Sequence, residues 1–216
     1  MRMSDRAWAE MMLLGVIWGA SFTMVAVAIR EMGPFQAVLW RTGLGAAVLW
    51  GAVALIGARA PMTWRFWGAC AVMGVLNNVI PFSLMAWGQQ SIESGLTSIL
   101  NASAAVFGAL VAAALLRDER LTARRAVAGV AAITGVEALS GLDPRSLGQM
   151  AVLGGALSYA FASTWARLTL GGPSPIASAA GMCTMAFLTM IPLTLWFEGP
   201  PPLDLSPGVW AAVAFY

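Results

Sequence analysis

Amide side chains and a proline lie inside a long apolar stretch of the sequence, LNNVIPFSLMAWGQQ at residues 76–90. Polar groups within a bilayer are costly, so such residues face a protein interior or a water-filled cavity. An amide offers both a donor and an acceptor, which suits a solute that carries both. Steps of three and four residues place part of this stretch on one helix face, flanked by Asn77 and Gln89: Gly74, Asn78, Pro81, Met85 and Gly88.

A second stripe of the same character follows in residues 95–116. It runs through Ser94, Thr97 or Ser98, Asn101, Ala105 and Gly108. The two stripes together predict a polar pathway between two neighbouring helices. The alternative is a pair of packing seams, since small residues let membrane helices approach closely and an amide can bridge them for about 1 kcal/mol. Pro81 lacks an N–H group, so we expect the helix to open about one turn earlier, near Asn77.

Arg41 and Glu137 are the charged residues that lie most clearly inside apolar stretches. Counted from the ends of those stretches, both lie roughly 8–11 Å from the outer edge of the membrane. We therefore expect either that they form an ion pair or that Glu137 titrates during the functional cycle. The alternative for Arg41 is a purely structural contact, such as one with a backbone carbonyl.

The composition predicts an all-α integral membrane protein. Only 10% of the 216 residues are charged and 59% are hydrophobic, whereas a soluble domain carries roughly 25% charged residues. Lysine and histidine are absent from the sequence, which excludes Schiff-base lysines, imidazole bases and histidine metal sites. Cys70 and Cys183 lie in apolar runs without CxxC spacing. We therefore expect no catalytic residues, no bound metal and no cofactor.

Breaks rich in charge, proline or glycine delimit the membrane-spanning helices, which need about 20 apolar residues each. The predicted helices lie near residues 9–29, 34–56, 66–88, 95–116, 126–142, 148–170 and 175–197. An eighth begins near Gly208 and has nine residues, so we expect about seven and a half helices in this chain. Gly15 and Gly19 match a GxxxG pattern, which predicts close packing of the first helix.

The arginines predict the orientation of these helices. With a cytoplasmic N-terminus, nine arginines lie on the inner side, while Arg30 and Arg145 lie outside and Arg41 lies within a span. Positive residues concentrate on the cytoplasmic side of membrane proteins. We therefore expect a multi-pass protein of the cell inner (plasma) membrane with its N-terminus in the cytoplasm.

A shift of 141 residues aligns two parts of the chain. It places Trp18 on Tyr159 and Pro34 on Pro175, and each of these prolines opens a span. The first helices of the two parts cross the membrane in opposite directions. We therefore predict a helix bundle of two inverted five-helix repeats (ten-helix type), an architecture found in many secondary transporters. Residues 1–142 would form the first repeat and residues 147–216 an incomplete second, so the chain is expected to be about three quarters of such a protein.

Several motifs, in this order, resemble the EamA-type transporters of the drug/metabolite transporter superfamily. VIWGASFTMVAVAI followed by GPFQAVLWRTGLGAAVL resembles the first two helices of that family, and the segment from NNVIPFSLMAWGQQ to TARRAVAGVAAITGV resembles its third to fifth helices. The likeness runs from about residue 11 to 140, and more loosely beyond. It implies ten helices in two inverted repeats and transport of small metabolites, often amino acids or their relatives, commonly outward.

The resemblance also implies that Trp18 and Phe22 lie beside a central cavity, which Asn78, Pro81, Ser98 and Asn101 line as well. Arg41 takes the place of the family's second-helix arginine and Glu119 that of its connector acid, while Ala105 stands where the family usually has a proline that bends the fourth helix. Glu137 stands where the family usually has an apolar residue. With the stripes and the repeat, the predicted substrate-binding residues are Trp18, Phe22, Asn77, Asn78, Pro81, Met85, Ser98, Asn101 and Tyr159, and the intramembrane charges are Arg41 and Glu137.

These observations predict a secondary transporter that exports a small metabolite, such as an amino acid or a related amphipathic solute, by alternating access. Trp18, Phe22 and Trp87 would contact apolar parts of the solute, and Asn78 and Asn101 its polar groups. Expected partners are the small-molecule solute and the lipid bilayer, with no nucleic acid; a homodimer stays open. The alternatives are a non-transporting membrane or assembly protein, an inactive fragment, and, less favoured because no carboxylates or histidines cluster, a lipid-handling membrane enzyme.

Overall fold

The computed structural model describes residues 5–116, 143, 146–170, 172 and 174–215. In this part of the chain every regular element is helical, which confirms the predicted class. The elements are α1 (Asp5–Ala28), α2 (Pro34–Leu55), α3 (Trp64–Gly74), the π-turn η1 (Val75–Val79), α4 (Ile80–Gly88), α5 (Ser94–Asn101), α6 (Ala104–Leu115), α8 (Leu147–Thr169), α9 (Pro175–Phe197) and α10 (Pro207–Phe215). The helix predicted near residues 126–142 lies outside the described residues.

Five helical segments are long and apolar enough to cross a membrane. They are Arg6–Ala28, Pro34–Leu55, Trp64–Gly88, Ser94–Leu115 and Pro175–Phe197. α8 has the same length as α9, 23 residues, but its sequence carries more small and polar residues, and ten of its residues are buried in the bundle. The chain is therefore a multi-pass membrane protein.

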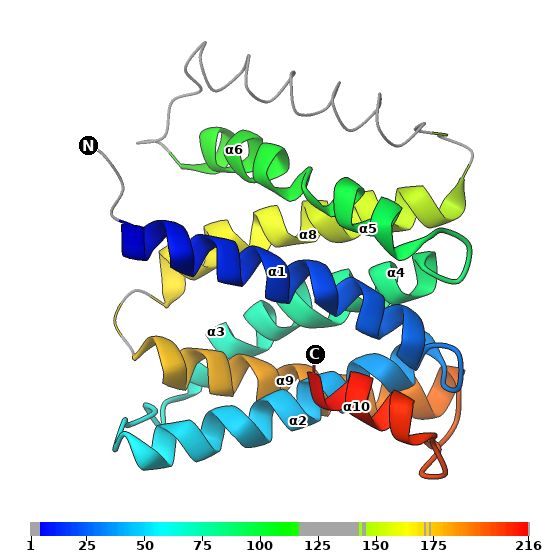
Figure 1. The fold of residues 1–216 in the computed structure, drawn as a ribbon. Helices are drawn as coiled ribbons and strands as arrows, with labels where there is room; N and C mark the ends of the chain where they lie inside the picture. Colours follow the sequence, from blue (N-terminus) through cyan, green and yellow to red (C-terminus); the bar gives the residue numbers. More distant parts are fainter. Residues whose placement is uncertain (1–4, 117–142, 144–145, 171, 173, 216) are drawn as a thin grey trace.

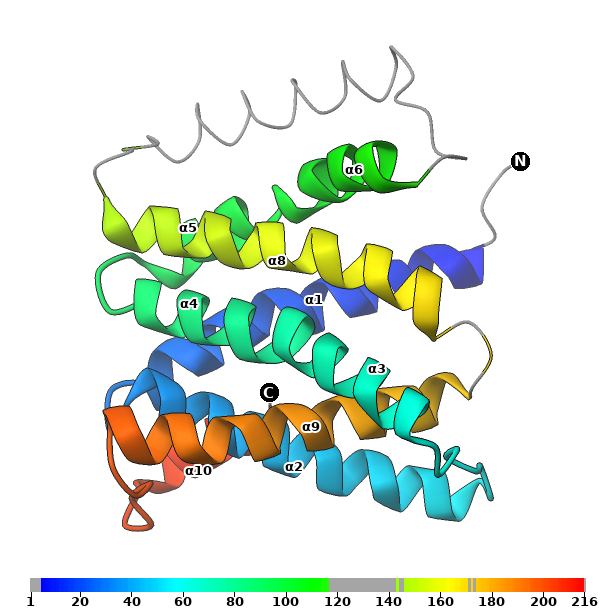
Figure 2. The ribbon, with the colours of Figure 1, turned by 180° about the vertical axis from the view of Figure 1, so that it is seen from behind.

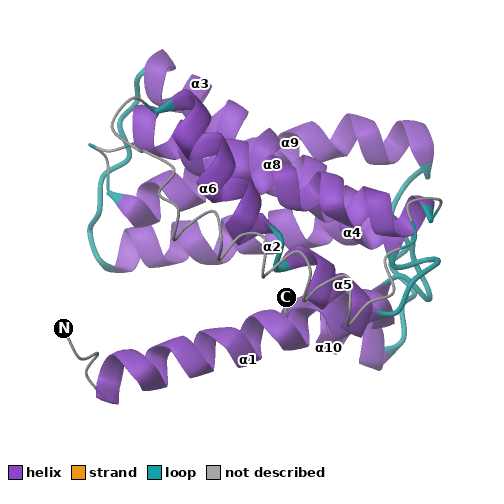
Figure 3. Ribbon diagram, turned by 90° about the horizontal axis from the view of Figure 1, so that it is seen from above, coloured by secondary structure: helices purple, strands orange, loops and turns teal. Residues whose placement is uncertain are grey.

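The helices lie side by side and most neighbours run in opposite directions (Figure 1). α2 packs along α9, and α8 packs against α4 and α6. From behind, α3 and α4 pass between α8 and α9 (Figure 2), and from above α1 lies along one side of the bundle (Figure 3). α1 runs opposite to α8, and α2 runs opposite to α9 (Figure 1).

The segment predicted as one helix near residues 95–116 is interrupted in the structure. α5 ends at Asn101 and α6 begins at Ala104. Between them the N–H groups of residues 102, 103 and 105 donate to carbonyls three residues earlier, at 3.1, 3.1 and 3.3 Å, and the Ser103 hydroxyl donates to the Leu100 carbonyl at 2.7 Å. Such bonds tighten the chain into a 3₁₀ turn. The interruption therefore forms without the proline that the family resemblance places at Ala105.

Glycines allow α4 and α8 to meet at backbone distance. A Cβ added at Gly88 would lie 2.8 Å from the Gly148 carbonyl oxygen, and one at Gly155 would lie 3.2 Å from the Pro81 carbonyl oxygen. Small residues at a membrane helix interface permit this approach. The close packing predicted for α1 at Gly15 and Gly19 is not seen among the described residues, because a Cβ at either position meets no described atom within 4 Å.

The N-terminus of α2 is held by a carboxylate that is distant in the sequence. The N–H of Phe35 donates to Glu198 Oε1 at 3.0 Å and the N–H of Gln36 donates to Glu198 Oε2 at 2.9 Å. The first N–H groups of a helix have no partner within it and carry partial positive charge, so a carboxylate is favoured there. Phe35 also stacks on Phe197, with ring centroids 5.3 Å apart. These contacts join α2 and α9 at one end of the bundle.

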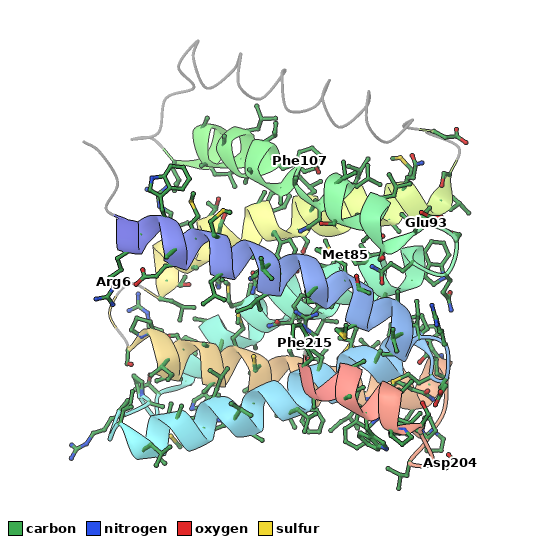
Figure 4. The ribbon with its side chains drawn as sticks, viewed as in Figure 1. Arg6, Met85, Glu93, Phe107, Asp204 and Phe215 are labelled. Atoms are coloured by element: carbon green, nitrogen blue, oxygen red, sulfur yellow. The ribbon has the colours of Figure 1, made fainter. Side chains whose placement is uncertain are left out.

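Replacing Glu198 by alanine is expected to lower the free energy of unfolding by about 1–2 kcal/mol, because two helix N–H groups lose their acceptor. Thermal unfolding in detergent measures this loss. Asp204→Ala is the matched control, since Asp204 is an exposed acidic residue of the following loop and lies at the edge of the molecule (Figure 4). Equal melting temperatures for the two variants would contradict the capping role.

A further contact at the same end joins the α1–α2 loop to the start of α10. Glu31 accepts hydrogen bonds from the Ser206 hydroxyl at 2.6 Å and the Ser206 N–H at 2.8 Å. These bonds hold the pKa of Glu31 below its ordinary value. Their contribution to stability is therefore present above the ordinary carboxyl pKa and is lost as the pH falls through the lowered pKa.

Candidate functional site

A cavity lies between α1, α2, α4 and α8, and aromatic rings form much of its wall. Its volume is about 30 Å³, enough for about two water molecules. We call it the central cavity. Its lining is Trp18, Ser21, Phe22 and Val25 of α1, Ala37, Val38 and Arg41 of α2, Phe82, Met85 and Ala86 of α4 with Gln89 at the end of that helix, and Tyr159 of α8.

Arg41 is the charged residue of this lining. Its guanidinium carbon lies 3.9 Å from the centroid of the Phe82 ring, a cation–π contact worth about 2 kcal/mol when it is desolvated. The Phe82 ring meets the Tyr159 ring edge-on, with centroids 6.3 Å apart. Arginine stays protonated and presents a planar fork of N–H groups that matches a carboxylate. Arg41 thus offers charged donors, and the rings an apolar surface, to groups that enter the cavity.

Several predicted site residues come together in this cavity. They are Trp18, Phe22, Arg41, Met85 and Tyr159, and Met85 lies in the interior of the bundle (Figure 4). Trp18 and Tyr159, which the 141-residue shift superposes, approach from α1 and α8. Trp87 does not belong to the lining, and 43% of its surface is exposed.

The predicted amide residues lie outside the lining of the central cavity. Asn77 Nδ2 donates to the Met182 sulfur of α9 at 3.6 Å. Asn78 is only 4% exposed, and its Nδ2 has no partner among the described residues. Oδ1 of Asn101, at the end of α5, likewise is buried and has no partner among the described residues. Ser98 on the same helix is half-buried. Among the described residues, one polar atom of Asn78 and one of Asn101 are therefore buried without a partner.

The opening expected at Pro81 takes the form of the π-turn η1. There the Ile80 N–H donates to the Val75 carbonyl, five residues earlier. In this register the N–H that Pro81 lacks would have bonded to the carbonyl of Leu76. The Ser158 hydroxyl of α8 donates to that carbonyl at 2.7 Å. The carbonyl that has no donor within its own helix thus lies one residue earlier than an α-helical register places it, and α8 supplies its donor.

We expect Ser158→Ala to lower the free energy of unfolding by about 1 kcal/mol, because the Leu76 carbonyl is left buried without a donor. Pro81→Ala restores an N–H group, so Ser158→Ala should cost less in that background. Ser163→Ala is the control, since the Ser163 hydroxyl donates to a carbonyl of its own helix on an exposed face. If the losses were strictly additive in a double-mutant cycle of thermal unfolding, Ser158 would not be the donor that replaces the N–H missing at Pro81.

The cavity face of α4 is rotated from most of the predicted stripe. Pro81 and Gly88 of the stripe meet α8, whereas Phe82, Ala86 and Gln89, each one residue further along, line the cavity together with Met85 of the stripe. One residue corresponds to a rotation of about 100° around a helix. The recurrence of Phe82, Ala86 and Gln89 at steps of four and three is the pattern that could have located this face.

Comparison with known proteins gives the family. The model of the EamA-like transporter family matches residues 7–140. The chain belongs to the EamA-like transporter family. The match spans α1 to α6, which carry all but one residue of the cavity lining, and it confirms the family that the motifs indicate.

Curated relatives of this EamA-like chain carry transporter names. An uncharacterized transporter of Archaeoglobus fulgidus is 22% identical over 188 residues, which cover 87% of this chain and 67% of the relative. A probable terminal-alkyne amino-acid exporter of Streptantibioticus cattleyicolor is 29% identical over 140 residues, 65% of this chain and 46% of the relative. The chain thus spans about two thirds of one relative and less than half of the other.

Two acidic positions of this EamA-like transporter lie outside the described residues. They are Glu119, which takes the place of the connector acid, and Glu137, the predicted partner of Arg41. The pairing of Arg41 with Glu137 and the titration of Glu137 therefore stay predictions.

Proposed function

We propose that the chain carries the solute site of a secondary transporter that exports a small amphipathic metabolite, such as an amino acid or a related compound, by alternating access. The observation that carries this proposal is the central cavity, where four aromatic side chains accompany Arg41 among the described lining residues. In apolar surroundings a fixed cation attracts a carboxylate strongly, and the rings offer contact to an apolar side chain. The amino-acid exporter among the relatives supports this solute class.

The division into inverted repeats, residues 1–142 and 147–216, is part of the proposal. The opposite directions of α1 and α8, and of α2 and α9, support it (Figure 1). So do the helix bounds, because adding 141 to the first residue of α2 gives the first residue of α9. In transporters built this way the solute binds between the repeats. Trp18 and Tyr159 would then supply equivalent rings from the two sides.

We further propose that Asn78 and Asn101 contact the solute in another state of the transport cycle. Their unpaired, buried amide atoms support this, because a buried polar atom without a partner costs about 1–3 kcal/mol. The arginine distribution supports a cytoplasmic N-terminus in the inner membrane. The N-terminus of α5 and the C-terminus of α4 would then lie on the outer side.

Counterflow in proteoliposomes tests the proposal. Vesicles that contain the purified protein and unlabelled L-leucine should take up radiolabelled L-leucine transiently, and vesicles without protein should not. L-Leucine serves as a small zwitterion with an apolar side chain. Counterflow with a panel of other amino acids, monocarboxylates and amines defines the range of solutes that the protein transports. Absence of counterflow for every amino acid would overturn the proposed solute class.

A further inference from the structure

A second and wider cavity opens beside the central cavity. Its volume is about 630 Å³, and it lies between the end of α1 and the turn that joins α4 to α5. We call it the outer vestibule; Arg30, Gln90, Glu93 and Ser94 lie in its lining, and Glu93 marks its position in Figure 4. Because Arg30 and Glu93 carry opposite charges, the vestibule favours neither cations nor anions alone and suits a solute that carries both charges.

Gln89 lies where the two cavities meet. Among the described residues it is the one that lines both the central cavity and the outer vestibule. Its side chain is 8% exposed, and its Nε2 donates to the Phe22 carbonyl of α1 at 3.3 Å. Its Oε1 is buried and has no partner among the described residues. One N–H of this amide is therefore bonded to the protein, while its acceptor oxygen has no bond among the described residues and can accept one from a ligand.

We propose that Gln89 selects solutes with an ammonium group: its Oε1 accepts a hydrogen bond from that group while Arg41 binds the carboxylate of the same zwitterion. The inference rests on the proposed function and adds the residue that recognises the ammonium group of the solute. Arg41 lies seven residues along α2 from Pro34, about 10 Å from the outer end. Gln89 lies at the outer end of α4, and helical side chains lean toward the helix N-terminus, here inward. The two groups thus border one cavity from different depths.

Charge-assisted hydrogen bonds are the stronger ones, and one of them is worth about a tenfold change in affinity or more. The test is calorimetric titration of the purified protein with L-leucine and with 4-methylpentanoate, which is the same molecule without the ammonium group. Gln89→Met keeps the approximate size of the side chain and removes the acceptor, together with the Nε2 bond to Phe22 that Gln89→Glu also loses. We expect its Kd for L-leucine to rise about 10-fold and its Kd for 4-methylpentanoate to stay unchanged.

Gln89→Glu separates recognition from structure. It keeps acceptor oxygens and loses the Nε2 bond to Phe22, so we expect affinity for L-leucine to be kept or raised and affinity for 4-methylpentanoate to fall. If both variants bound both solutes more weakly to the same extent, Gln89 would only join α4 to α1 and the inference would be overturned. If the unsubstituted protein bound no L-leucine, both the proposed solute class and this inference would fail.

Discussion

Arg41→Met is expected to reduce L-leucine counterflow about 100-fold or more, the largest functional effect of any single change in the central cavity. The guanidinium is the charged group of the lining and lies over the Phe82 ring. Methionine keeps the unbranched apolar part of the side chain but loses the charge and the N–H groups. A carboxylate in an apolar cavity would then have no counter-charge, and the loss of such a charge-assisted pair costs about 2–5 kcal/mol.

Further measurements separate a binding role of Arg41 from a structural one. Arg41→Lys keeps the charge but not the planar fork, so we expect an intermediate loss of about 10-fold. Binding of 3-methylbutylamine, which is L-leucine without its carboxylate, should survive Arg41→Met in calorimetry. A folded Arg41→Met variant with ordinary L-leucine counterflow would rule out carboxylate binding by this residue. If the variant lost binding of L-leucine and of 3-methylbutylamine to the same extent, Arg41 would have a structural role alone.

Gly88→Leu is expected to have the largest effect on folding. A Cβ at position 88 would already lie 2.8 Å from the Gly148 carbonyl oxygen and 3.1 Å from Val152 Cγ2. Backbone atoms of α8 cannot rotate away as a side chain can, so α4 and α8 must separate. We expect a loss of about 3 kcal/mol or more, seen as aggregation in size-exclusion chromatography and a lowered melting temperature.

Gly15→Leu is the matched control for this substitution. A Cβ there meets no described atom within 4 Å, and the surrounding part of α1 is exposed. Leucine at an exposed position of a membrane helix contacts lipid and favours insertion. Gly15→Leu should therefore elute and melt like the unsubstituted protein. Equal behaviour of the two leucine variants would contradict the close approach of α4 and α8.

The ends of the helices were largely predictable from the sequence, for local reasons. The predicted spans at residues 34–56 and 175–197 correspond to Pro34–Leu55 and Pro175–Phe197 in the structure. Each begins with a proline, which has no N–H to lose at the first position of a helix and already has a helical φ. The all-helical membrane class follows from composition in the same direct way.

The faces of the third predicted helix could not be read from the sequence. The stripe from Gly74 to Gly88 assumes an uninterrupted α-helical period, and η1 changes the number of residues per turn in its middle. As a result Gly74 meets α9, while Gly88 meets α8. Pro81 predicts an opening near Asn77 but not its π register, in which the Leu76 carbonyl accepts from the Ser158 hydroxyl of another helix.

Contacts between distant segments were also beyond prediction. Glu198 caps α2 across more than 160 residues of sequence, and its own neighbours carry no capping pattern. Gln89 was recognised as polar but not as a site residue, because its importance comes from the meeting of two cavities. Trp18 and Phe22, which the motifs place beside a cavity, are among the residues that line the central cavity.

Protection of a cysteine in the central cavity tests most directly whether solute binds there. In a Cys70→Ser, Cys183→Ser background, Ser21→Cys places a thiol in the lining, and Asp204→Cys places one on an exposed loop. A methanethiosulfonate reagent is applied to purified protein with and without saturating L-leucine. The predicted result is that L-leucine slows the reaction at position 21 several-fold and leaves position 204 unaffected. Equal rates at position 21 with and without L-leucine, in a protein that performs counterflow, would contradict solute binding in this cavity.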